Sequence, residues 1–225
     1  MPQESKPETE ITKHLDTINR LLKQYRLLLE SDKQFPSVVG TIMGQPVRGS
    51  WWGHPKGMLV YNTLKKFSLQ PGVLTTKLLA GKTTFVNRPL WPPFLTVATS
   101  REPWQTNGLS TGAKRLLIAV ESKGELRTDQ HSKTSRTPVG ELGEAARELE
   151  KRLLVYGEGF HSDIGSHAKR LETWDHWAAG RKYQWNRIEP DAAQRDLEKV
   201  TDRLQTEFGA SPPLPWRAKG RSEKT

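Results

Sequence analysis

Few side chains in the central part of the chain could act as a catalytic acid or base. Hydrolysis of a nucleic acid needs a histidine or a carboxylate that orients water, or carboxylates that hold magnesium. Residues 36–104 contain one histidine, His54 in GSWWGHPKG (49–57), and one carboxylate, Glu102 in REPW. If the chain is a hydrolase of the nuclease or base-excision glycosylase type, a DNA-repair activity, these two residues are its first catalytic candidates.

The same stretch holds two adjacent tryptophans and a lysine. The rings of Trp51 and Trp52 could stack on a base, and the ammonium group of Lys56 could bind a phosphate. Its glycines would let the backbone approach a ligand closely. The alternative interpretation places one ring in the hydrophobic core and the other over a joint between domains. Both interpretations remain open from the sequence.

A second cluster of titratable residues lies between Glu158 and His176. The series His161-x-Asp163-x3-His167 contains residue types that ligate metals. Its spacing matches neither HExxH nor a zinc-finger pattern. We therefore predict no metal site, and no short motif in the chain indicates a cofactor.

Positive charge is concentrated in the middle of a chain whose net charge is +10. Residues 36–104 contain eight basic residues, one acidic residue and four of the eight tryptophans. Basic residues interleaved with aromatic ones are typical of surfaces that bind nucleic acid, here most simply DNA. The phosphate-binding candidates in this segment are Lys56, Lys65, Lys66, Lys77, Lys82 and Arg88.

Composition excludes several classes of protein. The chain has no cysteine, which excludes disulfides and cysteine metal sites. Its start, MPQESKPETE, does not resemble a signal peptide, and no run of about 18 apolar residues predicts a membrane span. We expect a cytoplasmic protein without a membrane partner.

The N-terminal part of the chain predicts a long amphipathic helix. After a disordered stretch at 1–7, segment 8–35 carries apolar residues at alternating spacings of four and three, the pattern of a coiled-coil seam. The seam comprises Ile11, Leu15, Ile18, Leu22, Tyr25 and Leu29. The helix could dock on its own domain, or it could form a homodimer or adaptor surface through 8–33.

The basic segment 36–104 predicts a helix, a hairpin and a second helix. Glycines and a proline at 36–49 indicate short strands and turns. A helix follows over 58–69, and threonine- and valine-rich runs at 73–79 and 83–86 predict the hairpin. A similar helix and hairpin recur at 139–174, which is compatible with two tandem units of one kind.

Residues 109–177 have a more specific order of elements. TGAKRLLIAVESKGELRTDQ predicts a helix capped by Ser110 and a short extended piece at 125–128, and residues 129–135 can form one or two helical turns. TPVGELGEAARELEKRLLV predicts a third helix, and YGEGFHSDIGSHAKRLETW predicts two strands around a turn. This order resembles the winged helix-turn-helix superfamily. The resemblance implies a small fold of the DNA-binding type and no chemistry. The predicted class is α+β, mainly helical.

In a winged helix the third helix normally enters the major groove. Here that helix is rich in glutamate, which is unsuited to phosphates. Binding by this module would then use its wing and turn, where the candidates are Lys133, Arg136, Lys169 and Arg170.

The remaining chain predicts a basic connector and a helix over 178–208, then a disordered tail over 209–225.

Together the features of the whole sequence favour a DNA-binding protein that uses backbone phosphate contacts and aromatic stacking. The alternatives are a DNA-processing hydrolase and a protein-interaction adaptor.

Overall fold

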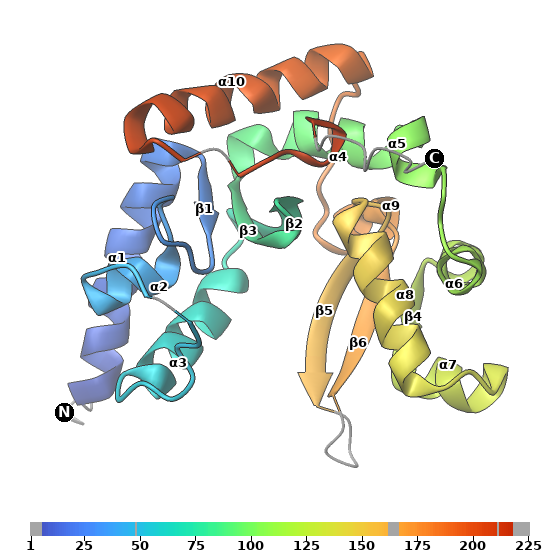
Figure 1. The fold of residues 1–225 in the computed structure, drawn as a ribbon, viewed down its shortest axis with the longest axis horizontal. Helices are drawn as coiled ribbons and strands as arrows, with labels where there is room; N and C mark the ends of the chain where they lie inside the picture. The colour runs from blue at the N-terminus through green and yellow to red at the C-terminus, as the bar shows by residue number, and fades with distance from the viewer. Residues whose placement is uncertain (1–5, 48, 162–166, 211, 218–225) are drawn as a thin grey trace, which may run out of the picture.

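The computed structural model describes residues 6–47, 49–161, 167–210 and 212–217. In this part of the chain helices predominate and the strands form two three-stranded antiparallel sheets (Figure 1), which confirms the predicted α+β, mainly helical class. No helix within these ranges is both long and apolar enough to cross a lipid bilayer.

Residues 6–87, here called the N-terminal unit, combine three helices with one sheet. In chain order the elements are α1 (Lys6–Tyr25), β1 (Leu27–Leu29), α2 (Val38–Met43), α3 (Gly57–Ser68), β2 (Val73–Leu79) and β3 (Lys82–Asn87). Strand β3 lies between β1 and β2 and pairs antiparallel with both.

Residues 111–172, here called the C-terminal unit, repeat this arrangement. The elements are α6 (Thr111–Lys123), β4 (Glu125–Arg127), α7 (Thr128–Ser135), α8 (Val139–Lys151), β5 (Tyr156–His161) and β6 (His167–Glu172). Strand β6 lies between β4 and β5. The two units therefore share both the order of six elements and the order of strands in the sheet.

Helix α1 ends at Tyr25, so the prediction of one helix over 8–33 was wrong at its C-terminal end. Arg26 has a φ of 71°, outside the right-handed helical region, and β1 follows directly. Successive side chains of a strand point to opposite faces. Leu27 and Leu29 therefore enter one buried cluster and Leu28 enters another. Three consecutive leucines are buried in this way, which a helix with one apolar stripe could not achieve.

Residues 36–49 contain helix α2 where short strands were predicted. The hydroxyl of Ser37 accepts a hydrogen bond from the Gly40 N–H at 3.2 Å and caps the helix. Gly44 ends it with a φ of 75°. The glycines of this segment obscured a buried helical face formed by Val38, Val39 and Ile42.

The apolar stripe of α1 is used within the chain. Ile18 and Leu22 are buried in a cluster with Val60 and Phe67 of α3. Ile11 is buried as well. This packing corresponds to the docked helix, because a coiled-coil partner would need the same side chains.

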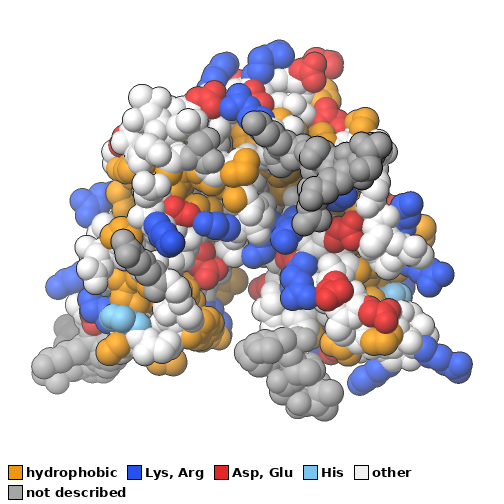
Figure 2. Space-filling view, viewed as in Figure 1, with side chains coloured by type: hydrophobic (Ala, Val, Ile, Leu, Met, Phe, Trp, Pro, Cys, Tyr) orange, Lys and Arg blue, Asp and Glu red, His pale blue; other side chains and the backbone are white. Residues whose placement is uncertain are grey.

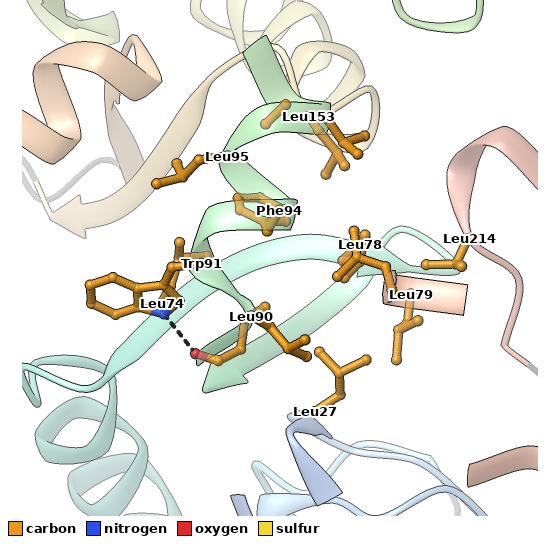
Figure 3. Close-up of a cluster of buried hydrophobic side chains, with 14 of the residues drawn as sticks. Leu27, Leu74, Leu78, Leu79, Leu90, Trp91, Phe94, Leu95, Leu153 and Leu214 are labelled. Carbon is orange, nitrogen blue, oxygen red and sulfur yellow. Dashed lines mark hydrogen bonds between the residues drawn. The ribbon is translucent and has the colours of Figure 1, made fainter. Parts of the chain in front are cut away.

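One buried cluster joins the two units (Figure 3). It combines the N-terminal sheet with Leu153 beyond α8 and with three connecting helices. These helices are α4 (Trp91–Thr99), α9 (Trp174–Gly180) and α10 (Pro190–Phe208). The indole N–H of Trp91 donates to the carbonyl of Val86 at 3.1 Å. Two short pieces, the 3-10 helix η1 (Arg88–Leu90) and α5 (Pro103–Thr106), complete the connection before α6.

The start of the C-terminal tail is ordered, which corrects the prediction of disorder from residue 209. Leu214 is buried in the joining cluster, and a 3-10 helix, η2 (Pro215–Arg217), follows. The indole N–H of Trp216 donates to Glu198 at 2.8 Å, and Arg217 forms an ion pair with Asp202 at 2.7 Å. The proline-rich sequence alone predicted disorder, because the side chains that hold this segment lie on α10. Residues 218–225 and 1–5 lie outside the described ranges.

Candidate nucleic-acid interface

The start of helix α3 is fixed by the loop that precedes it. The N–H of His54 donates to the Trp51 carbonyl at 3.1 Å, and the N–H of Gly57 donates to the His54 carbonyl at 2.7 Å. A Cβ atom on Gly57 would lie 2.9 Å from the Trp52 carbonyl oxygen. Only glycine allows this close approach, so the residue type at 57 holds the tryptophan loop against the helix.

The two tryptophans have different environments. Trp51 is 6 % exposed and packs in the core of the N-terminal unit, whereas Trp52 is 63 % exposed. Their rings stack with centroids 4.3 Å apart. Trp51 therefore lies in the core, as one interpretation of this sequence predicts, whereas Trp52 lies on the surface, where stacking on a base stays a prediction.

Helix α3 presents an exposed stripe next to Trp52. Its opposite face is buried through Val60, Thr63 and Phe67. The exposed residues recur at spacings of three, four and four, which places them on one face. They are Met58, Tyr61, Lys65 and, just beyond the helix, Leu69. The Tyr61 ring lies 5.6 Å from the Trp52 ring, so the two aromatic groups form one patch.

The charge near this patch is positive. Residues 36–101 contain no aspartate or glutamate. Lys56 and Lys65 are exposed, and within the described residues no carboxylate lies within 4.0 Å of either ammonium group. Lys66 forms an ion pair with Glu8 of α1, but both side chains are about half exposed, so the pair is weak. We refer to Trp52, Lys56, Met58, Tyr61, Lys65 and Lys66 as the α3 face.

The predicted hairpin cations lie elsewhere. Lys77 is partly buried between the units, where its ammonium group donates to the Thr83 hydroxyl at 2.8 Å. Burial lowers the pKa of Lys77, which the nearby Glu150 carboxylate opposes. Lys82 forms an ion pair with Asp32 at 2.7 Å. Both lysines therefore make their contacts within the N-terminal unit, and neither belongs to the α3 face.

Two of the four predicted cations of the C-terminal unit form ion pairs. Lys169 forms an ion pair with the buried Glu150, and Arg170 pairs with Glu158 at 3.0 Å and Glu172 at 3.2 Å. Lys133 and Arg136 are exposed near the turn between α7 and α8. Among the described residues neither has a carboxylate within the 4.0 Å that defines an ion pair.

Helix α8 occupies the same place in its unit as α3 but has a different surface. Its exposed residues include Glu141, Glu144, Arg147 and Lys151. Alternating signs of charge are typical of a solvated helix face. The comparison between two helices in equivalent positions therefore singles out α3 as the surface suited to a polyanion.

The two catalytic candidates are not brought together. His54 lies in the loop before α3, where its Nδ1 accepts a hydrogen bond from the Lys56 N–H at 3.1 Å. Glu102 caps α5, at the opposite side of the molecule (Figure 1), and accepts hydrogen bonds from Trp104 and Gln194. These contacts give Glu102 a structural role, and the pair does not form one active site.

One group of described side chains has the composition of a metal site. Ligand atoms of Glu125, Glu172 and His176 lie within 4.8 Å of one another. The guanidinium of Arg170 lies 3.9 Å from Glu125 and 3.2 Å from Glu172, and thus already supplies a positive charge to the cluster. We assign this cluster to an ion-pair network. The residue set His161, Asp163 and His167, for which no metal site was predicted, lies outside the described side chains.

Sequence reasoning missed the residues that follow α9. Two open cavities are lined by Arg181, Lys182 and Tyr183. One of them is also lined by Arg88, a predicted phosphate contact, and by Ser68 at the end of α3. The signal for these residues was present in RKYQWNR, which alternates basic, aromatic and amide side chains. Figure 2 shows basic side chains on both sides of the hollow between the two halves of the molecule.

No protein-family model, curated protein or solved structure that was compared with the chain matches it.

Proposed function

We propose that the protein binds DNA through the α3 face of its N-terminal unit. The observation that carries this proposal is the exposed aromatic and basic stripe on α3, in a stretch of 66 residues (36–101) without a carboxylate. A polyanion is attracted to such a surface, and exposed rings give it bases on which to stack.

The fold supports the same proposal. Helix, strand, helix, helix and a two-stranded hairpin, with the last strand in the centre of the sheet, is the arrangement expected of a winged helix. We propose that both units are winged-helix modules and that α3 and α8 are their third helices. In such modules the third helix is the element that enters the major groove. The acidic residues of α8 leave α3 as the binding helix.

The mode of binding follows from the side chains of the α3 face. Lys56, Lys65 and Lys66 would contact phosphates, which depends little on base sequence. Trp52 and Tyr61 would contact bases or sugars through their rings. Asn62 is the one amide on α3, so hydrogen bonding to base edges is limited and sequence preference should be modest.

Fluorescence anisotropy of a labelled duplex tests the proposal. We expect tight binding at about 50 mM salt and a steep loss at about 200 mM. Replacing Lys56 and Lys65 together with glutamate should weaken binding on unrelated sequences alike. It should also reduce the salt dependence by about one unit of slope for each phosphate contact that is lost.

A matched control is available on the equivalent helix of the other unit. Arg147→Glu together with Lys151→Glu makes the same change of charge on α8. If this control weakens binding as much as the α3 variant, binding follows net charge alone and the proposed face is wrong. Absence of binding at low salt would reject the proposed function altogether.

A further inference from the structure

Two adjoining open cavities lie where the connector between α9 and α10 meets the end of α3. The first has a volume of about 280 Å³, and its wall includes Ser68, Leu69, Arg88, Trp91, Arg181 and Tyr183. The second, of about 690 Å³, is lined by the connector and by Asp175, Ala178 and Ala179 of α9, and it shares Tyr183 with the first. Volumes in this range suit a small organic ligand or one unit of a polymer.

The end of α9 directs the connector into this place. The N–H of Tyr183 donates to the Ala178 carbonyl at 2.9 Å, and Lys182 has a φ of 50°. The chain therefore turns back sharply after the helix. This turn brings the Tyr183 ring to 5.0 Å from the Trp91 ring, edge to face, although 92 residues separate the two in sequence.

Two arginines on the cavity wall are held by aromatic rings. The guanidinium carbon of Arg88 lies 5.4 Å from the centre of the Tyr183 ring and 5.6 Å from that of Trp91. That of Arg181 lies 4.2 Å from the Trp177 ring. Stacking orders a guanidinium while it leaves N–H groups available for an anion.

These cations are not neutralised by the fold. Among the described residues no carboxylate lies within 4.0 Å of Arg88, Arg181 or Lys182, in contrast to Lys82 and Arg170. Arg187 lies 3.7 Å from Asp175, but both side chains are about two-thirds exposed, so this pair competes poorly with a phosphate.

The connector adds groups that recognise bases. Gln184 and Asn186 are exposed and flank Trp185, and Tyr183 precedes them. Side-chain amides can pair with base edges, and aromatic rings stack on base faces. Cations, rings and amides in one hollow are the combination that a nucleotide requires.

We propose that the two cavities bind unpaired nucleotides of the same DNA that the α3 face holds, an inference that rests on the proposed function. Continuity of the surface supports it. Ser68 is the last residue of α3 and Leu69 the next, and both line the first cavity. A strand that leaves the α3 face at the end of the helix would therefore meet the cavity wall that contains Arg88. The protein would then prefer DNA in which a duplex passes into a single strand.

The test compares a labelled blunt duplex of about 16 base pairs with the same duplex carrying about six unpaired thymidines at either the 3′ or the 5′ end. We expect one of the two overhangs to tighten binding about tenfold, the effect of a stacked base and one phosphate contact. Equal affinity for the blunt duplex and both overhangs would overturn the inference.

Variants connect the gain to the cavities. Arg88→Ala should abolish the advantage of the overhang, so that this variant binds the blunt duplex and the overhang substrate with equal affinity. Because Arg88 also packs on Trp91, Lys182→Glu with Arg187→Glu provides a second variant in which both altered side chains are exposed. Lys199→Glu, on an exposed position of α10, is the control that should keep the advantage. An advantage that survives both cavity variants would overturn the inference.

The two proposals fail in different ways. If the α3 face is wrong, Lys56→Glu with Lys65→Glu leaves binding of the blunt duplex unchanged. If only the cavities are wrong, that double variant weakens the blunt duplex while the overhang has no effect on the wild type.

Discussion

The indole ring of Trp52 lies almost parallel to that of Trp51, at an interplanar angle of 20°, yet only Trp51 is buried. Neighbouring residues of one loop thus belong to the core and to the surface. The buried ring anchors the exposed one, which keeps a large aromatic surface in a fixed orientation beside α3.

The two tryptophans should differ in their effect on stability. Trp51→Ala is expected to lower the free energy of unfolding by about 3–5 kcal/mol, because it empties a packed site. Trp52→Ala removes surface ring contacts with Trp51 and Tyr61 and should cost about 1 kcal/mol. Urea unfolding followed by circular dichroism measures both, and equal losses would contradict the assignment of one structural and one surface ring.

The close approach at Gly57 makes a second prediction. A Cβ atom at this position meets the Trp52 backbone, which cannot move without displacing the tryptophan loop. Gly57→Ala should therefore destabilise the protein by about 1–3 kcal/mol. Gly53→Ala is a matched control in the same loop, because a Cβ atom there meets nothing within 4 Å. A comparison of melting temperatures decides the point, and equal effects of the two substitutions would reject a role for close packing.

Asp32 should stabilise the protein in a way that depends on pH. Burial acts to raise the pKa of Asp32, but hydrogen bonds from Lys82 and from the N–H groups of Gln34 and Phe35 outweigh it and hold the pKa below its usual value. A lowered carboxyl pKa contributes stability at pH values above the unfolded pKa of about 3.9, and this stability is lost as the pH falls through the folded pKa.

The substitution Asp32→Asn tests this contribution. At pH 7 the variant should be less stable by about 1 kcal/mol, and the difference from wild type should close below about pH 4. Asp196→Asn is the control, because its pair with Lys199 is largely exposed and should contribute little at any pH. If the difference in stability between Asp32→Asn and wild type stays constant down to about pH 2–3, below the usual pKa of an aspartate, the carboxylate charge is not responsible for it.

The elements that sequence predicts best are those with local signals. Ser110 accepts a hydrogen bond from the Ala113 N–H at 3.1 Å, and Gly124 ends α6 with a φ of 76°. Capping residues act within one turn, so their effect is visible in a single stretch of sequence. The short strand β4 and the helix α7 lie where the sequence predicts an extended piece and helical turns.

Apart from α2, the elements that sequence did not predict depend on distant partners. The strand β1 exists because β3, more than 50 residues later, pairs with it. The cavity residue Tyr183 is placed by Trp91, and Leu214 is buried by contacts with a core built from both units. Neither composition nor periodicity contains these pairings, and a basic connector therefore concealed part of the candidate site.

The environment of Lys77 likewise depends on residues that are distant in the sequence, so it could not be predicted from the sequence alone. Its place on a hairpin suggested an exposed phosphate contact, but β2 packs beside α8 and the ammonium group lies near Glu150, Lys169 and Lys151.

Burial lowers the pKa of Lys77, so the charged form costs the folded state stability below the folded pKa. This cost disappears as the pH rises toward the unfolded pKa of about 10.4. Wild-type protein should thus gain stability relative to Lys77→Met as the pH rises through the alkaline range toward about 10.4. Lys65→Met, on the exposed stripe, provides the reference for general alkaline effects and should show no such change. If chemical denaturation at these pH values gives the same profile for both variants, the ammonium group of Lys77 is hydrated and the joint between the two units is open to water.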